Sequence, residues 1–284
     1  MKKYFCAVLT VLLLFSVLSG CSRQSSSVEL SGITGTTAVM QSTGSQPSST
    51  VPAATQEQSS RAEQQNTGDL YFSNQDIRES PAWVTQLDAV NDTHQLIVVA
   101  GVDKNTAYVT MHEKDDEGKW QQIIATPGFI GLDGLGNADV YHSYTPIGTF
   151  TIDKAFGLAD DPGCQMEYTK VDGDYYWSCD SREGMHFNEL VNIKDVPGLD
   201  TDSCERIADY DYAYQYVLNM GYNCEGIPEK GCAFFFHCFR VNRPYTGGCV
   251  AVPENIMKFI MQHIKPGCKI TIDYLENMNG SLDE

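Results

Sequence analysis

The chain has 284 residues, and its 37 acidic residues exceed its 19 basic ones, so its formal net charge is −18. Its hydrophobic fraction of 42% is enough for a sizeable core, and its charged fraction of 20% excludes global disorder. Proteins that bind nucleic acid through the phosphates need clustered Lys and Arg, so the acid excess argues against that class. The length suits one large domain or two small ones.

The first twenty residues have the composition of an export signal. Lys2 and Lys3 precede an apolar run over residues 4–18, which is too short for a membrane-spanning helix of about 20 residues but suits a signal-peptide core. Small residues then precede Cys21, a pattern that resembles the bacterial lipobox. The resemblance implies a lipoprotein signal peptide over 1–20, lipidation of the Cys21 sulfur, and anchoring to the outer face of the bacterial cell membrane. The alternative is an ordinary signal peptide with an incidental cysteine.

The composition changes after Cys21. Residues 22–68 are rich in Ser, Thr and Gln and contain few large apolar side chains. Such a segment cannot bury enough surface to offset its chain entropy. We therefore predict a disordered tether over 21–68, beginning at the lipidated cysteine, and a folded domain over 69–284.

The domain is predicted to be mainly β, with one or two short helices. Apolar or alternating segments bounded by Gly and Asp turns indicate strands. The clearest helix covers 253–264, where apolar residues recur at helical spacing after Pro253 and before a Pro-Gly stop. Residues 205–220 fit helical and strand spacing equally. The predicted strands cover 95–100, 107–112, 120–124, 145–152, 232–237 and 269–272.

Eight cysteines remain after the signal peptide and Cys21 are set aside, and disulfides are permitted outside the membrane. The sequence contains no Cys-x-x-Cys pair, which argues against a structural zinc site, so no metal is expected. Cys164 and Cys179 flank a predicted hairpin around 171–174, and we predict that they form a disulfide. The other pairings stay open.

A cysteine twelve residues after a histidine gives the clearest chemical signal. His237 closes an apolar segment, and Cys249 follows two glycines shortly before the predicted helix. A cysteine nucleophile needs an acceptor for the thiol proton and backbone N–H groups for the developing oxyanion. Glycines allow the sharp turn that exposes such N–H groups, and a following helix start favours the thiolate. By residue type alone, a core histidine and a disulfide cysteine are the alternative interpretation.

These residues resemble the signature of the L,D-transpeptidase catalytic domain, also called the YkuD family. That signature is a His, a spacer, then Ser/Thr-x-Gly-Cys and an apolar residue. The segment 145–150 also resembles the family's Thr-Pro-x-Gly-x-Phe stretch. The resemblance covers most of residues 83–273 and implies a β-sandwich or barrel. The matching positions of the signature are His237, Thr246, Gly248, Cys249 and Val250.

The resemblance implies acyl transfer on peptidoglycan stem peptides. Cys249 is the implied nucleophile and His237 the implied base, with the oxyanion and substrate held around Thr246, Gly247 and Gly248. Release of D-Ala and attack by a neighbouring stem amine would form a 3→3 cross-link without a cofactor. Hydrolysis of the same acyl-enzyme (L,D-carboxypeptidase activity) and a non-catalytic wall-binding lipoprotein with Cys249 in a disulfide are the alternatives. The expected partners are stem peptides and, through the lipid, the membrane, with a monomeric chain.

Two positions depart from the common family pattern. Many members have Arg two residues after the cysteine, where this chain has Ala251, and many have His or Asn where it has Gly247. The residue that steadies the substrate and the third member of the catalytic group are therefore left open. Among the other histidines, His142 and His186 are candidates to line the cleft. His94, His112 and His263 are predicted to be structural.

Overall fold

The computed structural model describes residues 77–282. The predicted signal peptide, Cys21, the tether and the start of the predicted domain lie outside the described residues. The described part is mainly β, as predicted, with two α-helices, α2 (Ala82–Thr85) and α3 (Glu254–His263). No helix in this part is long and apolar enough to cross a membrane. Short 3-10 helices cover Asp88–Asn91, Ile207–Tyr210, Ala213–Gln215 and Pro228–Lys230.

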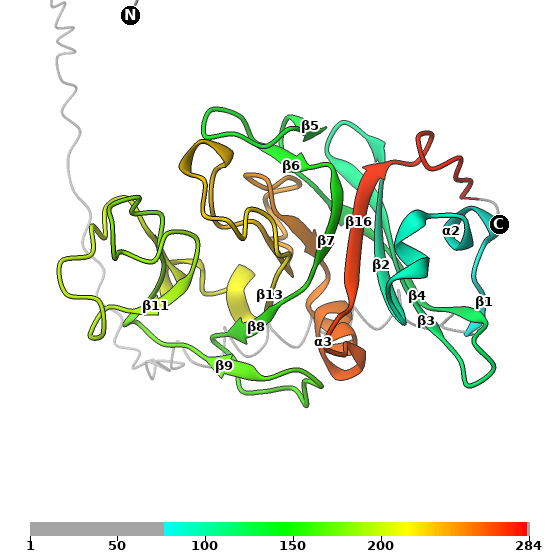
Figure 1. The fold of residues 1–284 in the computed structure, drawn as a ribbon, viewed down its shortest axis with the longest axis horizontal. Helices are drawn as coiled ribbons and strands as arrows, with labels where there is room; N and C mark the ends of the chain where they lie inside the picture. The colour runs from blue at the N-terminus through cyan, green and yellow to red at the C-terminus, as the bar shows by residue number, and fades with distance from the viewer. Residues whose placement is uncertain (1–76, 283–284) are drawn as a thin grey trace, which may run out of the picture. The chain divides into compact units, whose positions relative to one another are not determined.

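A mixed sheet of eleven strands curls around the main core (Figure 1). Its order is β7-β16-β2-β3-β4-β15-β14-β13-β8-β9, and β1 pairs with β4. The strands are β1 (Arg78–Glu79), β2 (Gln95–Asp103), β3 (Thr106–Lys114), β4 (Trp120–Phe129), β7 (Gly148–Thr151), β8 (Lys154–Gly157), β9 (Tyr168–Lys170), β13 (Val217–Asn219), β14 (Phe235–Cys238), β15 (Val250–Val252) and β16 (Lys269–Tyr274).

Smaller sheets complete the described part. One has the order β11-β10-β12, and the other pairs β5 with β6. These strands are β5 (Gly134–Gly136), β6 (Tyr144–Pro146), β10 (Tyr175–Trp177), β11 (Leu190–Asn192) and β12 (Glu205–Arg206).

Strand β2 is apolar along most of its length because both of its faces are covered. Ile97 and Val99 join the main core, while Leu96 and Val98 pack in a second cluster with Trp83 of α2. All four of these β2 side chains are fully buried. The continuous apolar pattern that predicted a strand here thus reflects burial on two sides.

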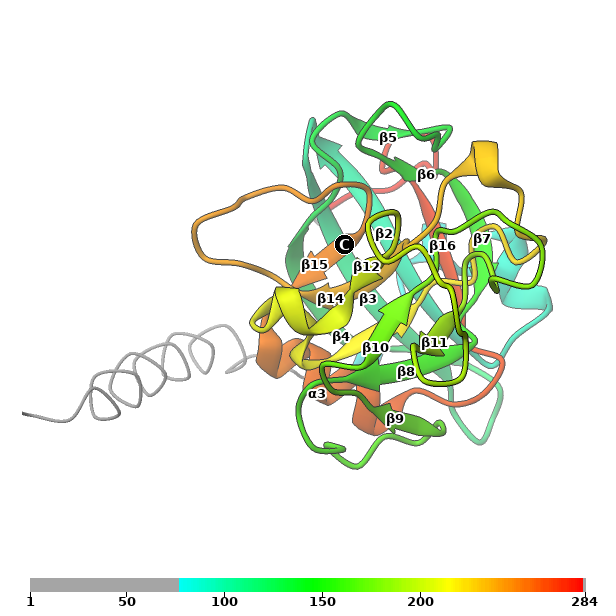
Figure 2. The same ribbon diagram turned by 90° about the vertical axis from the view of Figure 1, so that its left-hand side faces the viewer.

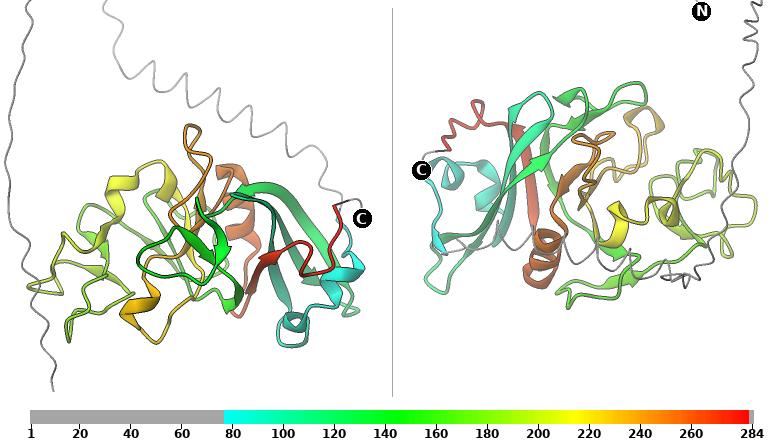
Figure 3. Two further views of the ribbon diagram at one scale, coloured as in Figure 1. Left: turned by 90° about the horizontal axis from the view of Figure 1, so that it is seen from above. Right: turned by 180° about the vertical axis from the view of Figure 1, so that it is seen from behind.

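Helix α3 packs its apolar stripe into the main core, as its spacing predicts. Its ribbon lies against the curled sheet in Figures 1 and 3. Pro253 is the N-cap rather than the first helical residue. The helix ends at His263, and Ile264 has already turned to extended backbone. The buried stripe residues are Ile256, Met257, Ile260 and Met261.

The segment predicted as one strand over 145–152 is two strands. Strand β6 pairs with β5, whereas β7 pairs with β16. Gly148, the first residue of β7, has φ +146, a value that L side chains rarely adopt, so the chain can change sheets there. The segment 205–220, ambiguous from sequence, contains β12, two 3-10 turns and β13.

The predicted hairpin around 171–174 and the predicted Cys164–Cys179 disulfide are both wrong. Strand β9 before the turn pairs with β8, and β10 after it pairs with β11 and β12, so the two strands belong to different sheets. Cys179 is bonded instead to Cys232, 53 residues later, and Cys164 is a free thiol. The predicted pair was chosen because the two cysteines are close along the chain. Tertiary packing instead brings the segment before β14, which contains Cys232, against Cys179.

Candidate active site

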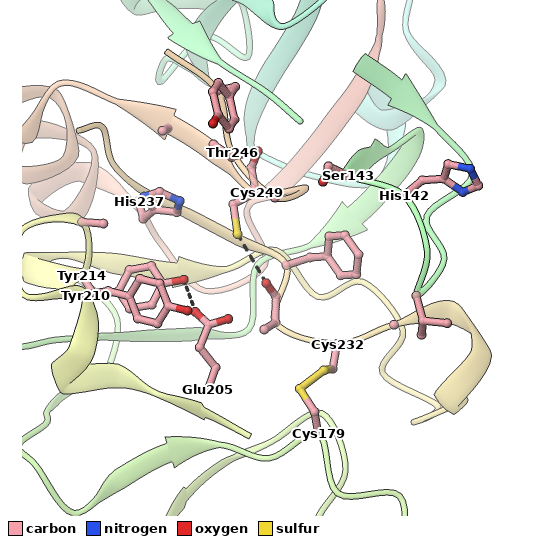
Figure 4. A pocket seen from close by; sticks show the side chains of 18 of the residues that line it. His142, Ser143, Cys179, Glu205, Tyr210, Tyr214, Cys232, His237, Thr246 and Cys249 are labelled. Carbon is pink, nitrogen blue, oxygen red and sulfur yellow. Dashed lines mark hydrogen bonds between the residues drawn. A yellow bond between two sulfur atoms is a disulfide. The ribbon is translucent and has the colours of Figure 1, made fainter. Parts of the chain in front are cut away.

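His237 lies on β14, and Cys249 immediately precedes β15, which runs parallel to β14. In the β14–β15 pairing, His237 lies opposite Ala251, so Cys249 lies just before the first residue of β15. Both side chains line one pocket with a volume of about 510 Å³, and both are 8% exposed. Figure 4 shows the two side chains at the wall of this pocket. The structure thus brings together the two residues that the motif predicts.

The Cys249 thiol is a free, hydrogen-bonded group. Its Sγ donates to the carbonyl oxygen of Ala233 at 3.3 Å and accepts from the N–H of Phe235, also at 3.3 Å. Burial, with a smaller contribution from the nearby Glu205 carboxyl, raises the pKa of the thiol to about 12. The resting group is therefore a protonated thiol at neutral pH.

His237 is held by the main chain. Its Nδ1 lies 2.8 Å from the carbonyl oxygen of Cys238. A carbonyl can only accept, so Nδ1 carries the proton and Nε2 holds the lone pair that a base needs. Burial lowers the pKa of His237 to about 4, so the ring is neutral at rest. The sequence left open which group orients His237, and in the structure the Cys238 carbonyl does so.

The resting pair is therefore uncharged. Within the described residues no hydrogen bond joins His237 to Cys249, because the thiol is directed to the Ala233 carbonyl. A proton could pass between them only after the thiol turned toward the imidazole, and contacts in active sites are often loose before substrate binds. The predicted help from a helix start is not found: β15, about 10 Å of extended chain, separates Cys249 from α3.

Two buried threonines fix the turn that carries Cys249. Thr246 Oγ1 donates to the carbonyl oxygen of Cys249 at 2.6 Å and accepts from the N–H of Gly248 at 3.1 Å. Thr145 Oγ1 donates to the same carbonyl at 3.1 Å and accepts from the N–H of Gly131 at 2.8 Å. The 145–150 motif therefore lies directly against the cysteine turn. The Thr246 hydroxyl braces this turn and is not available to a substrate at rest.

The two glycines before Cys249 differ in what they require. Gly248 has φ +137, and a Cβ there would lie 2.7 Å from the Phe234 ring and 2.9 Å from the carbonyl oxygen of Tyr144. A Cβ on Gly247 would meet nothing within 4 Å. Because the N–H of Gly248 is already donated to Thr246, the N–H groups of Gly247 and Cys249 are the better candidates for holding an oxyanion.

Asn188 holds the main chain that contacts the thiol. Its Oδ1 accepts from Trp177 Nε1 at 2.8 Å and from the N–H of Ala233 at 3.2 Å. Its Nδ2 donates to the carbonyl oxygens of Tyr222 and Asn223, each at 3.0 Å. Ala233 has φ +62, a conformation that an alanine adopts only when its surroundings impose it. The disulfide at the preceding residue, Cys232, restrains the same segment.

Sequence reasoning missed a carboxyl group in the pocket. The Glu205 carboxyl accepts a hydrogen bond from the Tyr214 hydroxyl, and burial is the main cause that raises the pKa of Glu205. The Tyr214 ring meets the His237 ring edge to face at 5.3 Å between centroids. Figure 4 shows these groups beside the cysteine. Glu205 and Tyr214 lie in the 205–220 segment, where no sequence motif distinguishes a residue that lines a pocket from one that packs in the core.

The other histidines fall into two groups. His142 lines the pocket, as suggested, and its Nδ1 lies 2.9 Å from Asp139 Oδ2. His186 is absent from the pocket lining and pairs with Glu189. His112 is structural, buried between Ser80 and Thr110. Over residues 77–282, no group of three His, Cys, Asp or Glu side chains is arranged to hold a metal ion.

The glycine pair provides a matched test of the turn. Gly248→Ala should lower the alkylation rate of Cys249 or destabilise the fold, since its Cβ collides with the Phe234 ring and a carbonyl at a strained φ. Gly247→Ala should leave both unchanged, because its Cβ enters open space. Thermal unfolding and peptide-resolved alkylation measure the two effects. Equal behaviour of the two variants would contradict this account of the turn.

The neutral resting pair predicts a distinctive pH profile. The rate of iodoacetamide alkylation at Cys249 should still be rising between pH 8 and pH 10, because its raised pKa keeps the thiolate a minor species there. A small thiol with an ordinary pKa, near 8.5, levels off in that range and serves as the control. Mass spectrometry of the Cys249 peptide separates this thiol from the others. A plateau below pH 8 would instead indicate a preformed thiolate–imidazolium pair.

No protein-family model matches the sequence, and no curated protein matches it. The solved structures similar to it include the helical cell shape determining protein Pgp2 from Campylobacter jejuni, at 15% identity and a TM-score of 0.36 over 65% of this chain and 49% of that one. The chain thus spans about half the length of Pgp2. Another is a fused Zn-dependent amidase/peptidase/peptidoglycan-binding domain-containing protein from Clostridium acetobutylicum ATCC 824, at 16% identity and a TM-score of 0.30 over 70% of this chain and 66% of that one.

Proposed function

We propose that this protein is a cysteine acyltransferase of the L,D-transpeptidase type, acting on peptidoglycan stem peptides. The observation that carries the proposal is the meeting of the motif residues His237 and Cys249 in one pocket, with the imidazole tautomer fixed by a backbone carbonyl. The proposal rests on the motif and on this site, and not on the similar solved structures.

The first half-reaction acylates the cysteine. As the thiol leaves the Ala233 carbonyl, His237 Nε2 takes its proton and Sγ attacks the carbonyl carbon before the terminal D-Ala. The N–H groups of Gly247 and Cys249 hold the oxyanion that forms. Collapse of this intermediate breaks the C–N bond, and the imidazolium gives its proton to the leaving D-Ala amine. A thioester on Cys249 and neutral His237 remain.

The second half-reaction transfers the acyl group. The side-chain amine of a neighbouring stem attacks the thioester carbon, His237 takes a proton from that amine, and the thiolate leaves and is reprotonated. The product is a 3→3 cross-link, and the enzyme returns to its starting state. In the resting enzyme both groups are neutral, so the thiol needs His237 Nε2 as the acceptor of its proton when it attacks.

Two alternatives are distinguished by product and by thiol state. Water in place of the amine gives L,D-carboxypeptidase activity at the same site. The wall-binding alternative required Cys249 in a disulfide, and the free Cys249 thiol favours catalysis over it. We further propose that a lipid on Cys21 holds the enzyme at the outer face of the cell membrane, within reach of this substrate.

Incubation of the purified chain with disaccharide-tetrapeptide tests the proposal. A dimer lacking one D-Ala indicates transpeptidation, and a monomeric tripeptide indicates carboxypeptidation. Cys249→Ser should abolish both products, because an alcohol is far less acidic than a thiol. His237→Ala should reduce turnover about 10²–10⁴-fold, the usual effect of losing a general base.

Cys224→Ser is the matched control, because Cys224 is an exposed free thiol outside the pocket lining. It should retain full activity. Turnover retained by Cys249→Ser, or lost equally in Cys224→Ser, would refute the assignment of the nucleophile.

A further inference from the structure

Two arginines of the pocket lack an acidic partner. Arg240 and Arg243 both line it, and neither guanidinium makes an ion pair or a side-chain hydrogen bond with any residue in 77–282. By contrast, Arg182 and Arg206 are paired with carboxylates. In a chain with a net charge of −18, two pocket guanidinium groups that form no ion pair are unexpected.

Aromatic rings support both guanidinium groups without neutralising them. Arg240 Cζ lies 5.2 Å from the centroid of the Tyr210 ring, and Arg243 Cζ lies 5.0 Å from that of Tyr245. Both tyrosines also line the pocket. Stacking on a ring leaves the N–H donors at the edge of the guanidinium plane available for a ligand.

The two arginines belong to the segment that joins the base to the nucleophile. The N–H of Arg243 donates to the carbonyl oxygen of Arg240 at 3.1 Å, which closes a tight turn between β14 and β15. Figure 2 shows the connection between these strands projecting from the sheet. A ligand held by this turn lies beside the pocket that contains His237 and Cys249.

The acidic groups of the pocket already have partners. Asp139 is paired with His142, and Glu205 accepts from the Tyr214 hydroxyl. Arg240 lies near enough to Glu205 to oppose the rise of that carboxyl's pKa, although the two form no ion pair. The pocket therefore offers two guanidinium groups to an anion and no free carboxylate to a cation.

We infer that Arg240 and Arg243 form a carboxylate subsite, which binds the free C-terminal carboxylate of the acyl donor. This inference rests on the proposed function. The guanidinium fork matches the two oxygens of a carboxylate, and such charged hydrogen bonds are among the strongest in proteins. The leaving D-Ala carries its carboxylate immediately beyond the bond that Cys249 attacks. The subsite thus selects donors that end one residue after the acyl carbon.

Binding to an inactive variant tests the subsite without turnover. Calorimetry on Cys249→Ala should show that a tetrapeptide stem with a free C-terminal carboxylate binds at least about tenfold more tightly than its C-terminal amide, the scale of one charged hydrogen bond. Adding Arg240→Met and Arg243→Met should abolish this difference, and Arg240→Lys with Arg243→Lys in their place should restore part of it. Lys119→Met, which removes an exposed charge outside the pocket lining, should leave the difference intact.

The inference would be overturned if Cys249→Ala bound acid and amide equally, or did not bind the acid. It would also be overturned if the preference for the acid survived the Arg240→Met and Arg243→Met changes. The proposed function is judged separately, by turnover of the unmodified chain. There, the double Met change should raise KM for the donor more than it lowers kcat. An unchanged KM would also contradict the subsite.

Discussion

The parallel pairing of β14 with β15 is the constraint on which the site depends. It places Cys249 beside Phe235, whose N–H reaches the sulfur, and it sets His237 opposite Ala251. Alternation along β14 separates its two faces: Phe236 and Cys238 join the main core, whereas Phe235 packs in the cluster that contains Cys249. A one-residue slip of this register would move His237 to the core side, away from the pocket that it shares with Cys249.

Burial keeps Cys249 and His237 uncharged, and backbone carbonyls fix the orientation of each side chain. Burial disfavours charge on both groups, raising the pKa of the thiol and lowering that of the imidazole. A main-chain carbonyl then accepts a hydrogen bond from each group: that of Ala233 from the thiol and that of Cys238 from Nδ1–H. The positive φ of Ala233, imposed by Asn188 and the neighbouring disulfide, is what directs its carbonyl to the sulfur.

The sequence correctly predicted those elements and residues that are determined by local patterns of side chains. Alternation and apolar runs located β2, β3, β4 and β16, helical spacing located α3, and the motif identified two residues that share a pocket. Sequence-based prediction failed for features that are determined by packing between segments far apart in the chain. The Cys179–Cys232 bond, the separation of β9 from β10 and the arrival of Glu205 at the cysteine depend on contacts between distant segments, for which one sequence carries no local signal. Arg240 and Arg243 were missed because exposed loop charges look alike until a pocket is seen around them.

The most direct test of the account is the intact mass of the protein after brief mixing with tetrapeptide and quenching in acid. The account predicts an adduct equal to the tetrapeptide less D-Ala, released by hydroxylamine as a thioester is, and located on the Cys249 peptide. An adduct on another free cysteine, such as Cys204, would contradict the account. Product formation without any adduct on Cys249 would contradict it as well.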